Sequence, residues 1–148
     1  MQPGGNLQEV YSRLVSALNG LDSTGIKFAL KEGIGYLTFC PSNLGTGMRV
    51  SCHMKIPLLA QQPNFEALCK SLGLQARGVD GEHTESKDGV YDISNIQRLG
   101  KTELDIIRDL AKAVQELIGK EQKLEQDAER ASKAETPEKT EATEKTRD

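Results

Sequence analysis

The chain of 148 residues carries 22 acidic and 19 basic side chains, which gives a formal net charge of -3. Nine acidic and six basic side chains fall in residues 121–148, so residues 1–120 hold 13 of each sign and are neutral overall. A neutral region with three Tyr, three Phe and no Trp lacks the basic patch and most of the aromatic surface of a general nucleic-acid-binding protein. The length and the 36% hydrophobic content suit one modest folded core.

The cysteines and the N-terminus indicate the cellular compartment. Cys40, Cys52 and Cys69 are odd in number and include no CxxC pair, so they predict neither a disulfide framework nor a zinc ribbon. The two histidines, His53 and His83, lack a nearby ligand pattern, so we expect no metal site. The chain shows no signal-peptide pattern and no run of 18 apolar residues. We expect a soluble cytoplasmic protein without a membrane anchor.

The first predicted element is a helix over residues 7–21. Asn6 stands at its N-cap, and Glu9 is placed as the reciprocal partner of that cap. Seven apolar residues recur at helical spacing and should be buried against another element. They are Leu7, Val10, Tyr11, Leu14, Ala17, Leu18 and Leu21.

Two strands are predicted next. Residues 36–40 read as a short strand that Pro41 ends, and a turn-rich segment follows over residues 41–47. Residues 48–56 alternate strictly between apolar and polar side chains, as in a strand with one buried face. The apolar set is Met48, Val50, Cys52, Met54 and Ile56, and the polar set is Arg49, Ser51, His53 and Lys55.

The second half of the chain predicts two helices and two more strands. A short helix over residues 65–72 precedes a strand over 74–77, a Gly-rich loop over 78–89 and a strand over 90–94. A long amphipathic helix follows over residues 102–120. The fold class is therefore α+β, with an antiparallel sheet backed by the helices at 7–21 and 102–120. The composition beyond residue 122 is too polar to form a core, so we expect a charged tail over 123–148, whose start could extend the helix and whose end should be disordered.

Three groups of residues could carry chemistry. Cys40 lies beside the glycine-containing turn and could be an exposed thiolate, or simply a small buried residue. Arg49, His53 and Arg77 would converge on one sheet face if their strands pair, and would form either a phosphate-binding cradle or a solvated polar surface. The loop of residues 77–89 could be a lid that brings Glu82 to a cationic substrate, or a solvated loop.

The segment Cys-Pro-Ser-Asn-Leu-Gly-Thr at residues 40–46 matches the active-site signature of the guanidino-kinase (phosphagen kinase) family. Further similar blocks follow in the same order at residues 77–86, 89–95 and 98–100. The chain resembles this family, and arginine kinases most of all, across nearly all of residues 4–122. The resemblance implies that residues 1–122 are the C-terminal part of a glutamine-synthetase-like catalytic domain, and that residues 123–148 lie outside it.

The resemblance also implies roles for single residues. Cys40 would be the thiolate beside the substrate guanidinium, and Glu82 would be a loop carboxylate that orients it. The nucleotide-binding residues would be Arg49 and Arg77 at the phosphates, His53 and Asp92 near adenine and ribose, and Gly78, Val79, Asp80, Gly81 and Glu82 in the loop that closes over ATP. Mg²⁺ would be held through phosphates and water.

The resemblance finally implies a reaction, the transfer of the γ-phosphoryl group of MgATP to a guanidinium. Glu82 favours arginine as the substrate, because creatine kinases have an apolar residue in the corresponding loop; taurocyamine and lombricine remain open. The chain would be about the last third of such an enzyme, so we expect little or no turnover without the N-terminal part. The alternatives are a non-catalytic nucleotide-binding module and, last, a thiol enzyme centred on Cys40.

Overall fold

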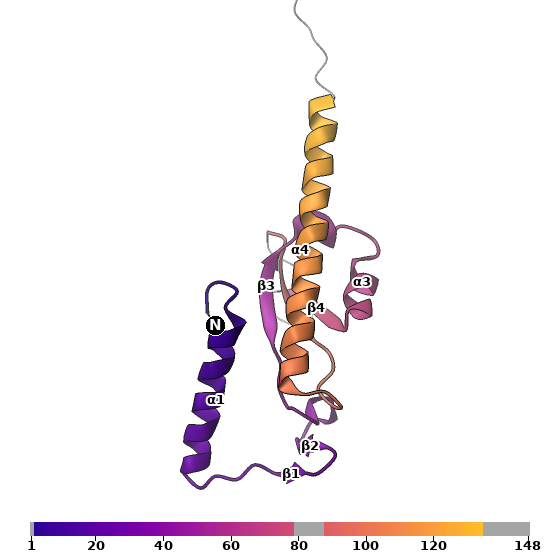
Figure 1. Cartoon of the computed structure of the whole chain (residues 1–148). Coiled ribbons are helices and arrows are strands. Elements are labelled where there is room, and N and C mark those ends of the chain that lie inside the picture. Colours follow the sequence, from indigo (N-terminus) through magenta and orange to yellow (C-terminus); the bar gives the residue numbers. More distant parts are fainter. Residues whose placement is uncertain (1, 79–87, 135–148) are drawn as a thin grey trace, which may run out of the picture.

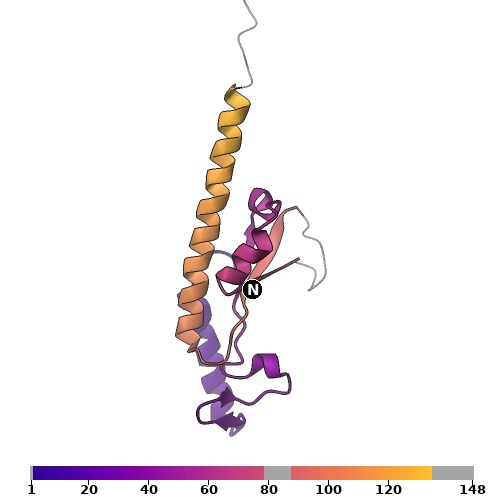
Figure 2. The ribbon, with the colours of Figure 1, turned by 90° about the vertical axis from the view of Figure 1, so that its right-hand side faces the viewer.

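The computed structural model describes residues 2–78 and 88–134. Three antiparallel strands, β3 (Ser51–Lys55), β5 (Val90–Asn95) and β4 (Leu74–Gly78), form the main sheet in the order β3-β5-β4. Helices α2 (Pro57–Ala60), α3 (Phe65–Ser71) and α4 (Glu103–Ala134) complete the folded unit. Figures 1 and 2 show α4 running along the sheet. The predicted α+β class is confirmed.

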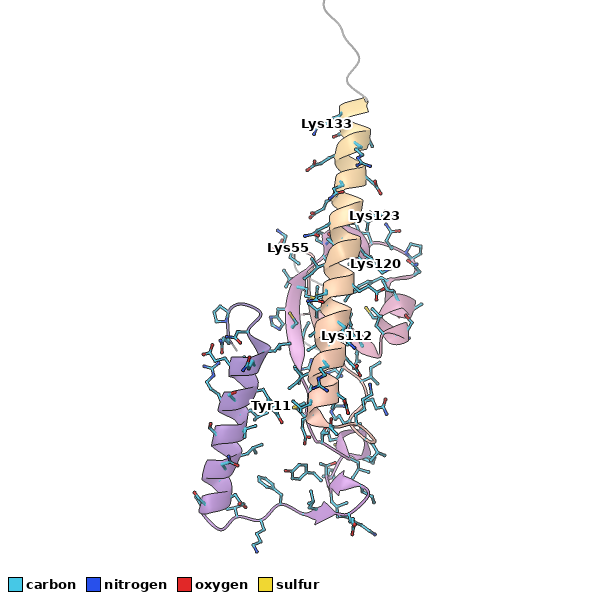
Figure 3. The ribbon with its side chains drawn as sticks, in the orientation of Figure 1. Tyr11, Lys55, Lys112, Lys120, Lys123 and Lys133 are labelled. Atoms are coloured by element: carbon cyan, nitrogen blue, oxygen red, sulfur yellow. The ribbon has the colours of Figure 1, made fainter. Side chains whose placement is uncertain are left out.

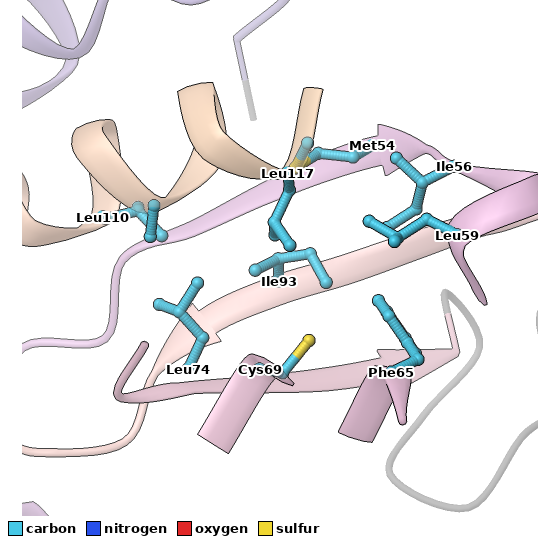
Figure 4. Close-up of a cluster of buried hydrophobic side chains, with 10 residues drawn as sticks. Met54, Ile56, Leu59, Phe65, Cys69, Leu74, Ile93, Leu110 and Leu117 are labelled. Carbon is cyan, nitrogen blue, oxygen red and sulfur yellow. The ribbon is translucent and has the colours of Figure 1, made fainter. Parts of the chain in front are cut away.

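One face of the sheet and the three helices share a single hydrophobic core (Figure 4). Ile93 of the central strand is fully buried, as is Leu117 of α4. The remaining buried members are Met54, Ile56, Leu59, Phe65, Cys69, Leu74, Leu110 and Ala113. Because the side chains of a strand alternate, burial of this face turns His53, Asp92 and Arg77 to the other face.

The backbone register aligns those polar residues in rows across the sheet. His53 of β3 lies opposite Asp92 of β5, and Asp92 in turn lies opposite Arg77 of β4. Side chains directly opposite each other on neighbouring strands are in contact range. The register therefore brings together residues from three separate parts of the chain.

A buried carboxylate joins α4 to α2. Glu121 is 4% exposed, and its two carboxylate oxygens accept hydrogen bonds from the backbone N–H groups of Leu58 and Leu59, at 2.9 and 2.6 Å. These N–H groups belong to the first turn of α2, which has no partner for them within the helix. Glu121 thus caps the N-terminus of α2, although it follows Leu59 by 62 residues in the sequence.

Helix α4 continues beyond the predicted end at residue 120, as far as Ala134. Leu124 is the last residue that packs against the core, and residues 125–133 are all exposed. Figure 3 follows the lysines along α4 from Lys112 to Lys133, beyond the rest of the described fold. The proposed division of the chain at residue 122 falls inside this helix and stays a prediction.

The N-terminal helix α1 (Leu7–Ser23) forms as predicted, but it does not pack as predicted. The backbone N–H of Glu9 donates to the Asn6 side chain at 3.2 Å, which confirms the N-cap. No residue of α1 is buried, and Val10, Leu14, Leu18 and Leu21 are 38–43% exposed. The expectation that this helix backs the sheet is wrong: α1 stands apart from the sheet and α4 (Figure 1).

The predicted strand at residues 36–40 is also wrong. The strand β2 contains only Gly35–Tyr36 and pairs with β1 (Leu30–Lys31). The Tyr36 N–H also donates to the Gly45 carbonyl at 2.7 Å, so the chain between these two residues forms a closed loop. Within this loop Pro41–Asn43 form the short 3-10 helix η1. The chain therefore folds back on itself where extended pairing was expected, since Pro41 cannot donate to a sheet.

Candidate functional site

A cluster of charged side chains surrounds Asp92 on the polar face of the sheet. The Arg49 guanidinium donates to Asp92 Oδ2, and His53 Nε2 lies 3.8 Å from Asp92 Oδ1. Arg77 faces Asp92 from the opposite strand and donates to Gln75 Oε1 at 2.9 Å. The Asp92 side chain is only 14% exposed. The four residues predicted to bind phosphates, adenine and ribose therefore lie together.

A third arginine, Arg98, extends the cluster. Its pKa is lowered by burial, and then by the positive charges of Arg49 and Arg77, so the three guanidinium groups lie within electrostatic range of one another. Arg98 belongs to the family-like block at residues 98–100, but the resemblance implies no role for it. Its signal was weak because it follows the end of β5, outside the alternating pattern of the strands.

The described part of the cluster gathers three arginines. Arg98 lies within electrostatic range of Arg49 and Arg77, and Arg49 donates to the Asp92 carboxylate. Each guanidinium has five N–H donors, and an arginine that holds Asp92 with one of them still has others for a second anion. Planar guanidinium groups that lie near one another suit the oxygen atoms of a polyphosphate.

The turn at residues 40–46 is held against the same end of the sheet. Thr46 donates its N–H to the Arg98 carbonyl at 3.2 Å, and Arg98 Nη1 donates to the Ser42 carbonyl at 3.2 Å. Gly45 has a φ of 103°, and a Cβ there would lie 2.4 Å from the Arg98 carbonyl oxygen. Glycine is therefore required for this close approach.

Cys40 lies on the exposed surface, immediately before η1. Its link to the cluster is indirect and runs through Arg98, which reaches the carbonyl of Ser42 two residues farther along. The other two cysteines face the core side of the sheet. Burial, with a smaller effect of Asp92, raises the pKa of Cys52, and burial followed by Glu66 raises the pKa of Cys69 to about 11.

The remaining predicted residues belong to the loop after β4. Gly78 is the last residue of β4 and is buried. The predictions for Val79, Asp80, Gly81 and Glu82 lie outside the described residues. Within residues 2–78 and 88–134, no group of three or more His, Cys, Asp and Glu side chains could hold a metal ion. In the same ranges, no helix is long and apolar enough to cross a bilayer.

A shallow pocket elsewhere lies between the β1–β2 hairpin and the start of α4, where Tyr36 and Thr102 are among its lining residues. None of the predicted site residues lines this pocket. The charged cluster around Asp92 is therefore the candidate site.

Comparison with known proteins decides the family. The C-terminal catalytic domain of the ATP:guanido phosphotransferases matches residues 1–124. The chain belongs to this family. Its matched part includes every residue of the charged cluster, the turn at residues 40–46 and the whole sheet, and ends at Leu124, the last core residue of α4.

Individual members of the family are close in sequence and structure. An arginine kinase of Haliotis madaka is 53% identical over 124 residues, which are 84% of this chain and 35% of that protein. A taurocyamine kinase of Schistosoma mansoni is 52% identical over 80% of this chain and 16% of its own length. The crystal structure of a lombricine kinase superposes with a TM-score of 0.80 at 42% identity, over 85% of this chain and 36% of that one. The chain thus spans about a third of the length of its arginine kinase relatives.

Proposed function

We propose that this chain provides the nucleotide-binding part of a phosphagen kinase, which transfers the γ-phosphoryl group of MgATP reversibly to the guanidinium of arginine. The observation that carries the proposal is that Arg49, Arg77 and Arg98 come together on the side of the sheet where Asp92 lies, in a chain of the ATP:guanido phosphotransferase family. Phosphoryl transfer depends mainly on positioning and on neutralising charge on the transferred group, which are tasks that arginines perform well.

Each residue has a part in this proposal. Arg49, Arg77 and Arg98 bind the phosphate oxygens and neutralise the charge that spreads over them in the transition state. Asp92 holds Arg49 in place before the nucleotide arrives, and with His53 it borders the nucleoside. Mg²⁺ arrives with the nucleotide and is held through phosphates and water. Cys40 lies beside the guanidino substrate as an orienting and electrostatic group, not as a covalent nucleophile, and Glu82 binds that substrate from the loop.

Substrate choice is the finer part of the proposal. Several of the similar proteins are arginine kinases, and a carboxylate at Glu82 suits an arginine-like guanidino compound. Taurocyamine and lombricine are second candidates, because kinases named for these compounds are similar to this chain over 80% and 85% of its length. Since the chain spans about a third of its relatives' length, we expect it to bind nucleotide but to turn over little by itself.

Two measurements test the proposal. Calorimetric titration of the chain with MgADP should give saturable binding, which Arg49→Ala and Arg98→Ala each weaken about tenfold or more, since each removes a charged hydrogen-bonding partner of phosphate. Arg108→Ala, which removes an exposed arginine of α4, is the matched control and should bind like the wild type. A folded chain that does not bind MgADP would contradict the nucleotide-binding role.

Turnover is tested in a chimera in which residues 1–124 replace the matching third of the Haliotis madaka arginine kinase. A coupled assay of ADP formation should show transfer to arginine, and Arg49→Ala in the chimera should abolish most of it. A folded chimera that is inactive with arginine, taurocyamine and lombricine would contradict the kinase proposal while leaving nucleotide binding to be judged by the titration.

A further inference from the structure

Asn95, the last residue of β5, makes an unusual set of hydrogen bonds. Its side-chain Nδ2 donates to the Met48 carbonyl at 3.2 Å and to the Gln97 carbonyl at 3.0 Å. Its Oδ1 accepts the N–H of Val50 at 2.8 Å. All the donors of the carboxamide are therefore used, and its oxygen is used as well, on main-chain groups.

Two of the residues that this carboxamide binds flank Arg49 in the sequence. Met48 and Val50 are its two neighbours in the chain, so one side chain fixes the peptide groups before and after it. The backbone N–H of Asn95 also donates to the Val50 carbonyl, at 3.4 Å. Asn95 is 8% exposed, and little water competes for these bonds.

Regular strand pairing does not hold this segment. The sequence predicts a strand over residues 48–56, yet β3 begins only at Ser51. At residues 48–50 the hydrogen bonds of Asn95 take the place of a regular ladder. The peptide groups on both sides of Arg49 are therefore held by the side chain of a residue 45 positions from Val50, and from this segment the Arg49 guanidinium reaches Asp92.

We propose that Asn95 is a positioning residue for nucleotide binding, which acts by holding the backbone on both sides of Arg49 so that its guanidinium faces the phosphates. The inference rests on the proposed function, since it concerns the same site. Asn95 itself does not bind the nucleotide; its effect passes through Arg49.

Calorimetric titrations of the chain test this with a double-mutant cycle. Asn95→Ala should weaken MgADP binding about tenfold, the effect of a lost charged hydrogen bond, and should leave the affinity for adenosine unchanged. In the Arg49→Ala background, Asn95→Ala should have almost no further effect, because the residue through which it acts is already absent. Asn95→Ser, which disturbs packing less, should fall between the wild type and Asn95→Ala.

Glu121→Gln is the matched control for a loss of stability alone. Glu121 is as buried as Asn95, and its side chain also binds main-chain groups, two of them, but in α2 and outside the charged cluster. This variant should keep wild-type affinity for MgADP. An equal loss of affinity in Glu121→Gln and Asn95→Ala, or full additivity of Asn95→Ala with Arg49→Ala, would overturn the positioning role.

A ligand-free measurement keeps the two proposals separate. In arginine side-chain NMR spectra, Asn95→Ala should shift or broaden the Arg49 Nε–H signal and leave that of Arg108 in place, while Glu121→Gln should change neither. An unchanged Arg49 signal overturns the inference about Asn95 whether or not nucleotide binds. A wild-type chain that binds no MgADP, but whose Arg49 signal responds to Asn95→Ala, refutes the proposed function and retains the positioning of Arg49.

Discussion

Gly45 joins the turn at residues 40–46 to the residues that follow β5. Its φ of 103° is a conformation that residues with a Cβ rarely adopt, and a Cβ would lie 2.4 Å from the Arg98 carbonyl oxygen. The glycine of the family signature thus has a steric explanation. It allows the turn and the segment after β5 to come so close that the Thr46 N–H can donate to the Arg98 carbonyl.

Gly45→Ala should destabilise the fold by about 1–3 kcal/mol, because backbone strain and overpacking add at this position. The free energy of unfolding can be measured by urea denaturation followed by circular dichroism. Gly119→Ala is the control: Gly119 lies in α4, a Cβ there would meet nothing within 4 Å, and alanine should stabilise the fold by about 0.5–1 kcal/mol. Equal stability of the two variants would contradict the steric argument.

The three cysteines should differ in their reaction with iodoacetamide, since the thiolate is the reactive form. Cys40 is exposed and should be alkylated first at pH 8. Burial raises the pKa of Cys52, and it raises the pKa of Cys69 to about 11, so both thiols stay mainly protonated at pH 8 and their alkylation should speed up as the pH is increased. Peptide mass spectrometry over about pH 7–10 measures each site. Alkylation of Cys69 as fast as that of Cys40 at pH 8 would disagree with the buried setting of Cys69.

At the scale of elements, the helices differ in what holds them. Helix α4 buries Leu110, Ala113 and Leu117 in the core that it shares with the sheet, and its N-terminus is capped by Thr102, whose Oγ1 accepts the N–H of Asp105 at 3.2 Å. Helix α2 has only four residues and cannot be stable by its own hydrogen bonds. It depends on Glu121, which α4 delivers to its first turn.

Glu121→Gln should therefore lower the stability of the fold by about 1–3 kcal/mol, because the amide keeps one acceptor but places N–H donors against a buried backbone N–H. The change should appear as a lower midpoint of thermal unfolding. Lys120→Gln, an exposed change next to it in α4, should have little effect. Faster hydrogen exchange at Leu58 and Leu59 in Glu121→Gln would locate the loss, and unaltered exchange there would argue against the cap.

At the scale of the whole molecule, the sheet and α4 form a unit with its own core, whereas α1 contributes nothing to that core. The exposed apolar side chains extend from α1 into the segment that follows it, where Phe28, Leu30 and Phe39 are also exposed. Both β3 and β4 are edge strands of the sheet, and exposed edges favour pairing between chains. These features lead us to expect poor solubility or self-association of the 148-residue chain.

Light scattering with size-exclusion chromatography tests this expectation. Leu14→Glu combined with Leu18→Glu should reduce association, because charges among the exposed apolar side chains of α1 oppose the burial of these side chains between two chains. Ser12→Glu combined with Ser16→Glu places the same charges with the same spacing elsewhere on α1, at positions that are also exposed, and should reduce it less. A monodisperse wild-type monomer would refute the expectation.

The sequence by itself determined the family, the fold class, the N-cap of α1 and the approximate positions of β3, α3, β4, β5 and α4, because these depend on local patterns and on the contiguous signature. It also named Arg49, His53, Arg77 and Asp92. The tertiary structure decided that these four lie together, since a strand pattern shows which face a side chain takes but not which strand it pairs with or in what register. Only the structure revealed that Arg98 belongs to the cluster, that Glu121 caps α2 and that the Asn95 side chain holds the backbone on both sides of Arg49. Hydrogen bonds between residues 45 and 63 positions apart, such as those of Asn95 and Glu121, produce no periodic pattern in the sequence.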